Sequence, residues 1–268
     1  ATIRIDFAAD VDPDASQDIV AWIEHIADQV SSLYGRFPVD SPRVLIIPTK
    51  TSARDDESPV PFGRVTRRGG ETVELYVDVD RPIGDLYADW TATHEFSHLL
   101  LPRISWREKW IAEGFASYYQ NVLMARTGQY TQAQAIRMLS EGLDRGRSSR
   151  PELSPNQAAR EGVRRARYKI YWSGAAIALL ADIELRERTG GKESLDTVLG
   201  RFQQCCLPAK RPWSGIEFFS RLDTLVKKPV FMPLYRQYAD RPGFPEIEEA
   251  LAKAIVRQQI FLVRTSTH

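Results

Sequence analysis

Residues 94–98 read HEFSH, a His-Glu-x-x-His unit. Two histidines four residues apart lie on one face of a helix, so the imidazoles of His94 and His98 can reach a single metal ion. Glu95 stands beside the first histidine and can face the water of such an ion without binding the ion itself. A catalytic zinc ion takes three protein ligands and keeps its fourth position for water, so the pattern calls for a third ligand elsewhere in the chain.

A carboxylate is the expected third ligand. The chain has four histidines, and the two outside HEFSH are His25, in an unrelated amphipathic pattern, and His268, the last residue. Glu113 lies in the apolar stretch WIAEGFASYY, far enough beyond His98 for the chain to turn at Pro102 and return on an antiparallel helix. Burying a carboxylate without a partner is costly. Zinc would satisfy it, and pairing with one of the many arginines is the alternative.

Composition limits which classes of protein and partner are plausible. The chain has 268 residues, 43% hydrophobic and 26% charged, with a formal net charge of +1. This balance gives no electrostatic reason to expect nucleic acid or an anionic membrane as a partner. The longer apolar runs stop near ten residues, whereas a membrane-spanning helix needs about 20, so we expect no membrane span. The start at Ala1 without Met favours an exported protein over a cytoplasmic one.

The two cysteines, Cys205 and Cys206, are adjacent in the chain. Adjacent cysteines make a poor structural staple, and two cysteines cannot form a disulfide framework. We therefore expect two buried or partly buried thiols.

Hydrophobic periodicity changes along the chain. Alternating or branched apolar residues predict strands over residues 2–8, 43–49 and 71–79, with a polar loop over 50–61 and a last strand at 260–263. A helical pattern begins at Asp14 and stops at Gly35 and Pro38. From Asp85 onward helices prevail, over residues 85–101, 107–126, 131–146, 166–188, 194–205, 215–226, 232–238 and 245–256. This order predicts an α+β fold with an N-terminal α/β lobe, residues 1–104, ending in the HEFSH helix, and a mainly helical lobe, residues 105–268.

HEFSH followed by WIAEGFASYY resembles the gluzincin zinc metallopeptidases, whose third ligand is the Glu of such a segment. Residues 171–199, YWSGAAIALLADIELRERTGGKESLDTVL, and residues 34–48, YGRFPVDSPRVLIIP, are similar to the glycyl aminopeptidase family within that group. The resemblance covers residues 34–202. It implies a thermolysin-like, two-lobed catalytic unit that hydrolyses peptide bonds in a peptide or protein substrate.

The resemblance also implies roles for single residues. His94, His98 and Glu113 would bind one Zn2+ ion, and Glu95 would be the general base. Tyr171 matches the tyrosine whose hydroxyl stabilises the tetrahedral intermediate. Tyr168, three residues earlier on much the same helix face, is its rival for that role.

One departure leaves the type of peptidase open. Aminopeptidase N-like relatives carry a Gly-x-Met-Glu-Asn segment before the zinc helix, and its acid holds the substrate's free amine. This chain has GRVTRRGGETVELYV there, in which Glu71 or Glu74 would have to substitute. Both an aminopeptidase and an endopeptidase therefore stay open, as does a catalytically inactive relative that uses the cleft only to bind peptides. We expect the strand Thr72–Asp78 to pair with an extended peptide.

Overall fold

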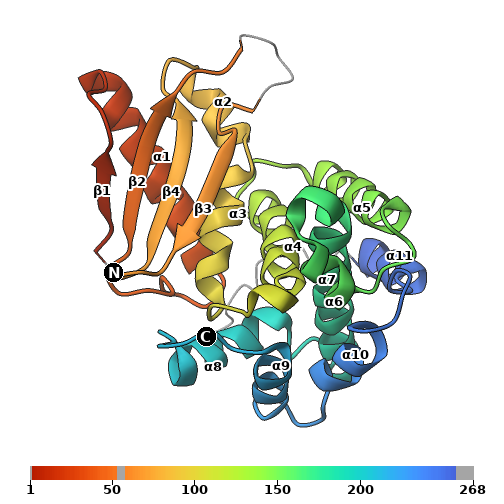
Figure 1. Cartoon of the computed structure of the whole chain (residues 1–268). Helices are drawn as coiled ribbons and strands as arrows, with labels where there is room; N and C mark the ends of the chain where they lie inside the picture. The colour runs from red at the N-terminus through yellow and green to blue at the C-terminus, as the bar shows by residue number, and fades with distance from the viewer. Residues whose placement is uncertain (1, 53–57, 258–268) are drawn as a thin grey trace. The chain divides into compact units, whose positions relative to one another are not determined.

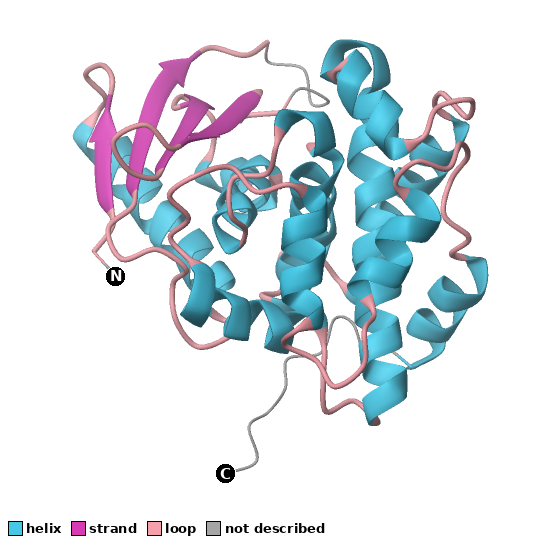
Figure 2. Ribbon diagram, turned by 60° about the horizontal axis from the view of Figure 1, so that its bottom comes forward, coloured by secondary structure: helices cyan, strands magenta, loops and turns pink. Residues whose placement is uncertain are grey.

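The computed structural model describes residues 2–52 and 58–257. The chain divides into two compact units, Ala1–Leu100 and Leu101–His268. Among the described residues every strand belongs to the first unit, and the second unit is built of helices and loops (Figures 1 and 2). The strand expected at residues 260–263 lies outside the described residues.

A four-stranded sheet forms the frame of the first unit. Its strands are β1 (Arg4–Phe7), β2 (Arg43–Thr49), β3 (Phe62–Thr66) and β4 (Thr72–Asp78). Their order is β1-β2-β4-β3, with β3 antiparallel to β4 and the other pairs parallel. Val44 pairs with Val73, and Ile46 with Leu75, and all four side chains are buried on one face. Alternating burial along β2 and β4 therefore fixes the register of the sheet.

The expected strands form, but one expectation about them is wrong. β4 lies between β2 and β3, so Thr72–Asp78 has strands on both sides and cannot accept an added peptide strand. The edge strands are β1 and β3, and the sequence did not reveal β3. Its five residues, FGRVT, include a glycine and an arginine, and a glycine inside a strand weakens the strand pattern.

The helices of the first unit are α1 (Pro13–Ser31), α2 (Ile83–Ala88) and α3 (Thr91–Ser97), followed by the 3-10 turn η1 (His98–Leu100). The single helix expected over residues 85–101 is therefore wrong. Asp89 has an extended backbone, with φ −80° and ψ 138°, which ends α2. Its carboxylate accepts a hydrogen bond from the backbone N–H of Thr91 at 2.7 Å, so the same residue satisfies a free donor at the start of α3. HEFSH thus lies on a short helix with its own start.

The second unit contains the helices expected for it and one that the sequence did not reveal, α6. They are η2 (Trp106–Glu108), α4 (Trp110–Arg126), α5 (Gln132–Ser148), α6 (Pro155–Glu161), α7 (Val163–Thr189), α8 (Leu195–Cys206), α9 (Gly215–Asp223), α10 (Phe231–Tyr238) and α11 (Glu248–Arg257). α6 spans seven residues between Ser154, its N-cap, and Gly162, and so is too short to show a clear hydrophobic period. None of the helices in the described part of the chain combines the length and the apolar character needed to cross a bilayer.

Two glycines let α4 and α7 touch backbone to backbone. A Cβ atom on Gly174 would overlap the carbonyl oxygen of Trp110, and one on Gly114 would overlap the backbone of Gly174. Because neither position has room for a side chain, the two helix axes can approach more closely than ordinary side chains would permit. This contact fixes α7 against the first turns of α4.

Cys205 and Cys206 are joined by a disulfide bond, so the expectation of two thiols is wrong. The pair ends α8, and the chain leaves the helix at Leu207. Cys205 is exposed, and Cys206 Sγ accepts a hydrogen bond from Arg221 Nε at 3.2 Å. The prediction assumed the spacing of ordinary structural disulfides, which excludes neighbouring residues.

Candidate active site

His94 and His98 lie on the same face at the end of the HEFSH helix. His94 is in α3 and is 2% exposed, whereas His98 opens η1 and is half-buried. Their ring centroids are 4.9 Å apart, with the ring planes at 85°. The Trp90 ring packs edge-on against His94 at 5.9 Å. The two imidazoles are thus neighbours one turn apart, as the spacing predicts.

The β3–β4 hairpin holds the end of this helix. Arg67 Nη2 donates a hydrogen bond to the backbone carbonyl of His98 at 2.8 Å, and Arg67 Nε lies 3.2 Å from Glu71 Oε2. A cation at a helix C-terminus is favourable because the last carbonyls carry partial negative charge. Burial raises the pKa of Glu71, and the Arg67 guanidinium acts against that rise. This pair therefore anchors the segment that carries the second histidine, a role that the sequence did not reveal.

Glu95 lies between the two histidines in sequence and is buried, at 8% exposed. Its side chain runs against the backbone of β3. A Cβ atom built on Gly63 would lie 2.5 Å from Glu95 Cγ and 3.2 Å from Glu95 Cδ. The edge strand and the candidate base are therefore in direct contact.

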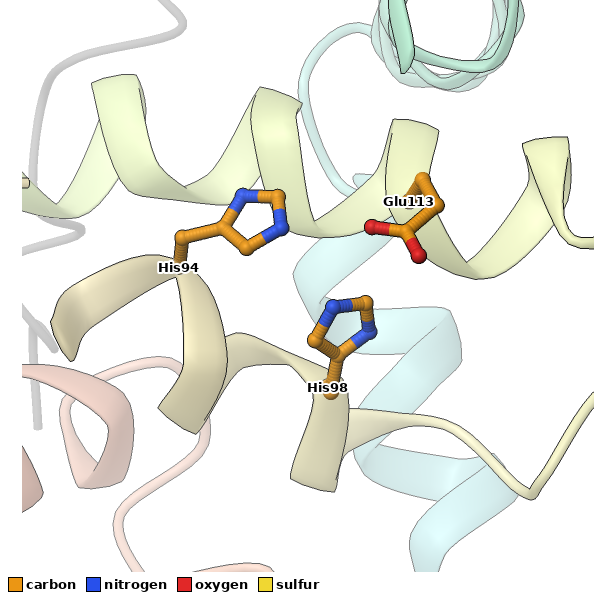
Figure 3. A group of neighbouring side chains, drawn as sticks. All are labelled: His94, His98 and Glu113. Carbon is orange, nitrogen blue, oxygen red and sulfur yellow. The ribbon is translucent and has the colours of Figure 1, made fainter. Parts of the chain in front are cut away.

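Glu113 lies in the first turn of α4 and is half-buried. One ligand atom from each of His94, His98 and Glu113 lies within 4.8 Å of the others. Figure 3 shows the two imidazoles and the carboxylate turned toward one another. Bond lengths of about 2.0–2.2 Å around a tetrahedral zinc ion place its ligands about 3.3 Å apart, so small side-chain movements would close the group around an ion. Two imidazole nitrogens and one carboxylate oxygen fit zinc.

Tyr171 and Tyr168 both lie in α7 but differ in exposure. Tyr171 is half-buried, with the Arg167 guanidinium carbon 5.7 Å from its ring centroid, whereas Tyr168 is 48% exposed. Tyr171 comes one turn before Gly174, where α7 touches α4 beside Glu113. Of the two tyrosines, Tyr171 therefore lies closer along the helices to Glu113, the candidate third ligand.

The two acids considered for binding a substrate amine are both paired with arginines. Arg64 faces Glu74 across β3 and β4, and Arg64 Nη2 lies 2.6 Å from Glu74 Oε2. Alternation along β3 turns Arg64 away from the face on which Gly63 meets Glu95. Glu71 is paired with Arg67. Neither carboxylate offers an unpaired charge.

Residues 103–176 match the family model of the M61 glycyl aminopeptidases. The matched segment contains Glu113 and Tyr171, and HEFSH lies before it. A search of curated protein sequences gives no match.

Solved structures extend the likeness to nearly the whole chain. An aminopeptidase N family protein from Idiomarina loihiensis superimposes with a TM-score of 0.68 at 14% identity, covering 92% of this chain and 46% of that one. The chain has the fold of the M1 zinc metallopeptidases. The M1 zinc metallopeptidase from Deinococcus radiodurans superimposes with a TM-score of 0.57 at 14% identity, covering 91% of this chain and 49% of that one. Yeast LTA4 hydrolase superimposes with a TM-score of 0.59 at 13% identity, covering 90% of this chain and 38% of that one.

These comparisons confirm the α+β fold and the gluzincin resemblance. The chain spans half or less of the length of the structures that it matches.

Proposed function

We propose that the protein is a zinc-dependent peptidase with His94, His98 and Glu113 as ligands of one Zn2+ ion. The observation that carries this proposal is the grouping of their ligand atoms within 4.8 Å of one another. The fold shared with M1 zinc metallopeptidases and the match of residues 103–176 to M61 glycyl aminopeptidases support it.

The chain's own residues supply the remaining chemistry. A zinc ion held by three protein ligands lowers the pKa of a bound water toward about 7 and polarises a carbonyl group. Glu95 accepts the proton of the attacking water and passes it to the leaving amine. Tyr171 donates a hydrogen bond to the carbonyl oxygen as negative charge develops there. The burial of Glu95 keeps bulk water away from the carboxylate during the transfer.

The substrate that suits this site is an extended peptide. β3 is one of the two edge strands of the sheet, and it directly contacts Glu95 through Gly63. An extended chain can add to a free strand edge through backbone hydrogen bonds. We propose that β3, in place of β4, aligns the scissile bond with the base. Because Glu71 and Glu74 are both paired with arginines, a blocked amino terminus should be tolerated.

The test is hydrolysis of a mixed library of free and N-acetylated peptides, with and without a zinc chelator. The chelator should abolish cleavage and added zinc should restore it. Glu95→Gln should lower kcat by about 10²–10⁴-fold, because the amide cannot accept the proton. Metal analysis should find one zinc per chain in both proteins.

Glu24→Gln is the matched control, since Glu24 is an exposed acid on α1. A Glu95→Gln variant with near-full activity would refute the assigned base. Cleavage that persists without metal would refute zinc chemistry. A wild-type chain that holds zinc and binds peptides without cleaving them would instead be an inactive binding protein.

A further inference from the structure

The backbone conformation at Gly63 does not require a glycine. Gly63 is the second residue of β3 and pairs with Leu75 of β4. Its φ is not among the positive glycine angles of the chain, so other residues could adopt its conformation. Glycine is also unfavourable inside a strand because it has no side chain to pack. The reason for it must lie in the surrounding space.

That space is taken by Glu95. The nearest neighbours of a Cβ at position 63 would be Glu95 Cγ at 2.5 Å, Leu75 Cδ2 at 3.1 Å and Glu95 Cδ at 3.2 Å. Carbon atoms in contact lie about 3.5–4.0 Å apart, so the methylene of Glu95 would have to move by roughly 1 Å. Leu75 Cδ2 would have to give by only a few tenths of an ångström, so the contact with Glu95 is the more demanding one.

The backbone of α3 cannot easily move instead. Thr93 Oγ1 donates a buried hydrogen bond to Gln29 Oε1 of α1 at 2.9 Å. The other end of the segment is held by Arg67 through the carbonyl of His98. With the helix held at both ends, a side chain at position 63 would displace the Glu95 side chain while leaving His94 and His98 in place.

We propose that Gly63 is a positioning residue for the general base. By lacking a Cβ atom, it lets the Glu95 carboxylate lie beside the strand that aligns the peptide. This inference rests on the proposed peptidase function. A misplacement of about 1 Å can cost on the order of 10²-fold in rate, so a single methyl group at this position should reduce catalysis strongly.

The test compares Gly63→Ala with Gly84→Ala in the zinc-loaded 268-residue chain. Gly84 is the control because it lies in α2, has no positive φ and has nothing within 4 Å of a built Cβ. Gly63→Ala should lower kcat for a cleaved library peptide by about 10–100-fold, with KM and zinc content unchanged. Gly84→Ala should leave all three unchanged. A purely structural defect would lower the amount of folded protein and leave the kcat of the folded fraction intact.

A second readout needs no activity. Thermal unfolding of the metal-free chain is measured for the wild type, Gly63→Ala, Glu95→Ala and the double variant. Gly63→Ala should lower the melting temperature in the wild-type background and lower it less, or not at all, when Glu95 has lost its Cγ. Equal shifts in both backgrounds, or a Gly63→Ala kcat within twofold of wild type, would overturn the proposal. A wild type that cleaves no peptide would refute the peptidase function, while the unfolding cycle would still decide whether Gly63 and Glu95 are coupled.

Discussion

At the scale of single residues, the two tyrosines of α7 offer the sharpest comparison. Tyr171 is half-buried and lies one turn before the contact of α7 with α4, whereas Tyr168 is largely exposed. We expect Tyr171→Phe to lower kcat by about 10²–10³-fold with little change in KM, because the lost hydroxyl acts only on charge that develops during the reaction. Tyr168→Phe is the matched control and should stay within about twofold. The reverse result would assign the role to Tyr168.

The candidate ligands and the candidate base could be predicted from the sequence because their side chains carry the chemistry. His94, His98 and Glu113 as ligands, and Glu95 as base, follow from residue type and spacing. Gly63 and Arg67 do not, because one acts by leaving space and the other through a backbone carbonyl 31 residues away. Contacts of that kind depend on the register of β3 against β4 and on the position of α3 in the fold. A single sequence does not show either.

At the scale of elements, the contact of α4 with α7 depends on two glycines. Gly174→Ala should push the helices apart and lower the free energy of unfolding by about 1–3 kcal/mol or more, because overpacking forces the backbone to move. Chemical denaturation against the wild type measures this change. Gly84→Ala serves again as the control, since its methyl group would meet nothing. An unchanged free energy of unfolding would show that α4 and α7 can accommodate the added methyl group without moving apart.

The elements also show where sequence patterns stop being informative. Long periodic helices such as α4 and α7 were predictable because their apolar positions recur over several turns. β3 and α6 were not, since each is too short to show a period. The break between α2 and α3 was not predicted because no proline or glycine marks it. Asp89 interrupts the helix through a local side-chain hydrogen bond.

At the scale of the whole molecule, Lys169 links stability to pH. Its side chain is fully buried and Nζ donates a hydrogen bond to the carbonyl of Gly243. Burial lowers the pKa of Lys169 to about 8 from its ordinary 10.5, and the nearby Glu152 charge acts in the opposite direction. Between these two values the unfolded chain binds the proton more tightly, so the free energy of unfolding should rise as pH increases from about 8 to about 10.5.

Lys169→Met should remove this part of the pH dependence. The shift of 10.5 − 8 = 2.5 pKa units corresponds to a difference on the order of 3 kcal/mol between the two ends of the window. Urea unfolding of the wild type and the variant at several pH values between 7.5 and 10.5 measures it. Parallel curves for the two proteins across that window would contradict the assignment.

The contact between Gly114 and Gly174 has a consequence for how function would be read from variation. In a scan of every substitution, both positions should be about as intolerant as the proposed zinc ligands, although neither carries a functional group. Glu113 directly precedes Gly114, and Tyr171 comes three residues before Gly174. A map of sensitive positions should therefore show two short clusters, each with one polar side chain and one glycine. Some substitutions should therefore inactivate the protein by filling space between packed helices, although they change no chemical group of the site.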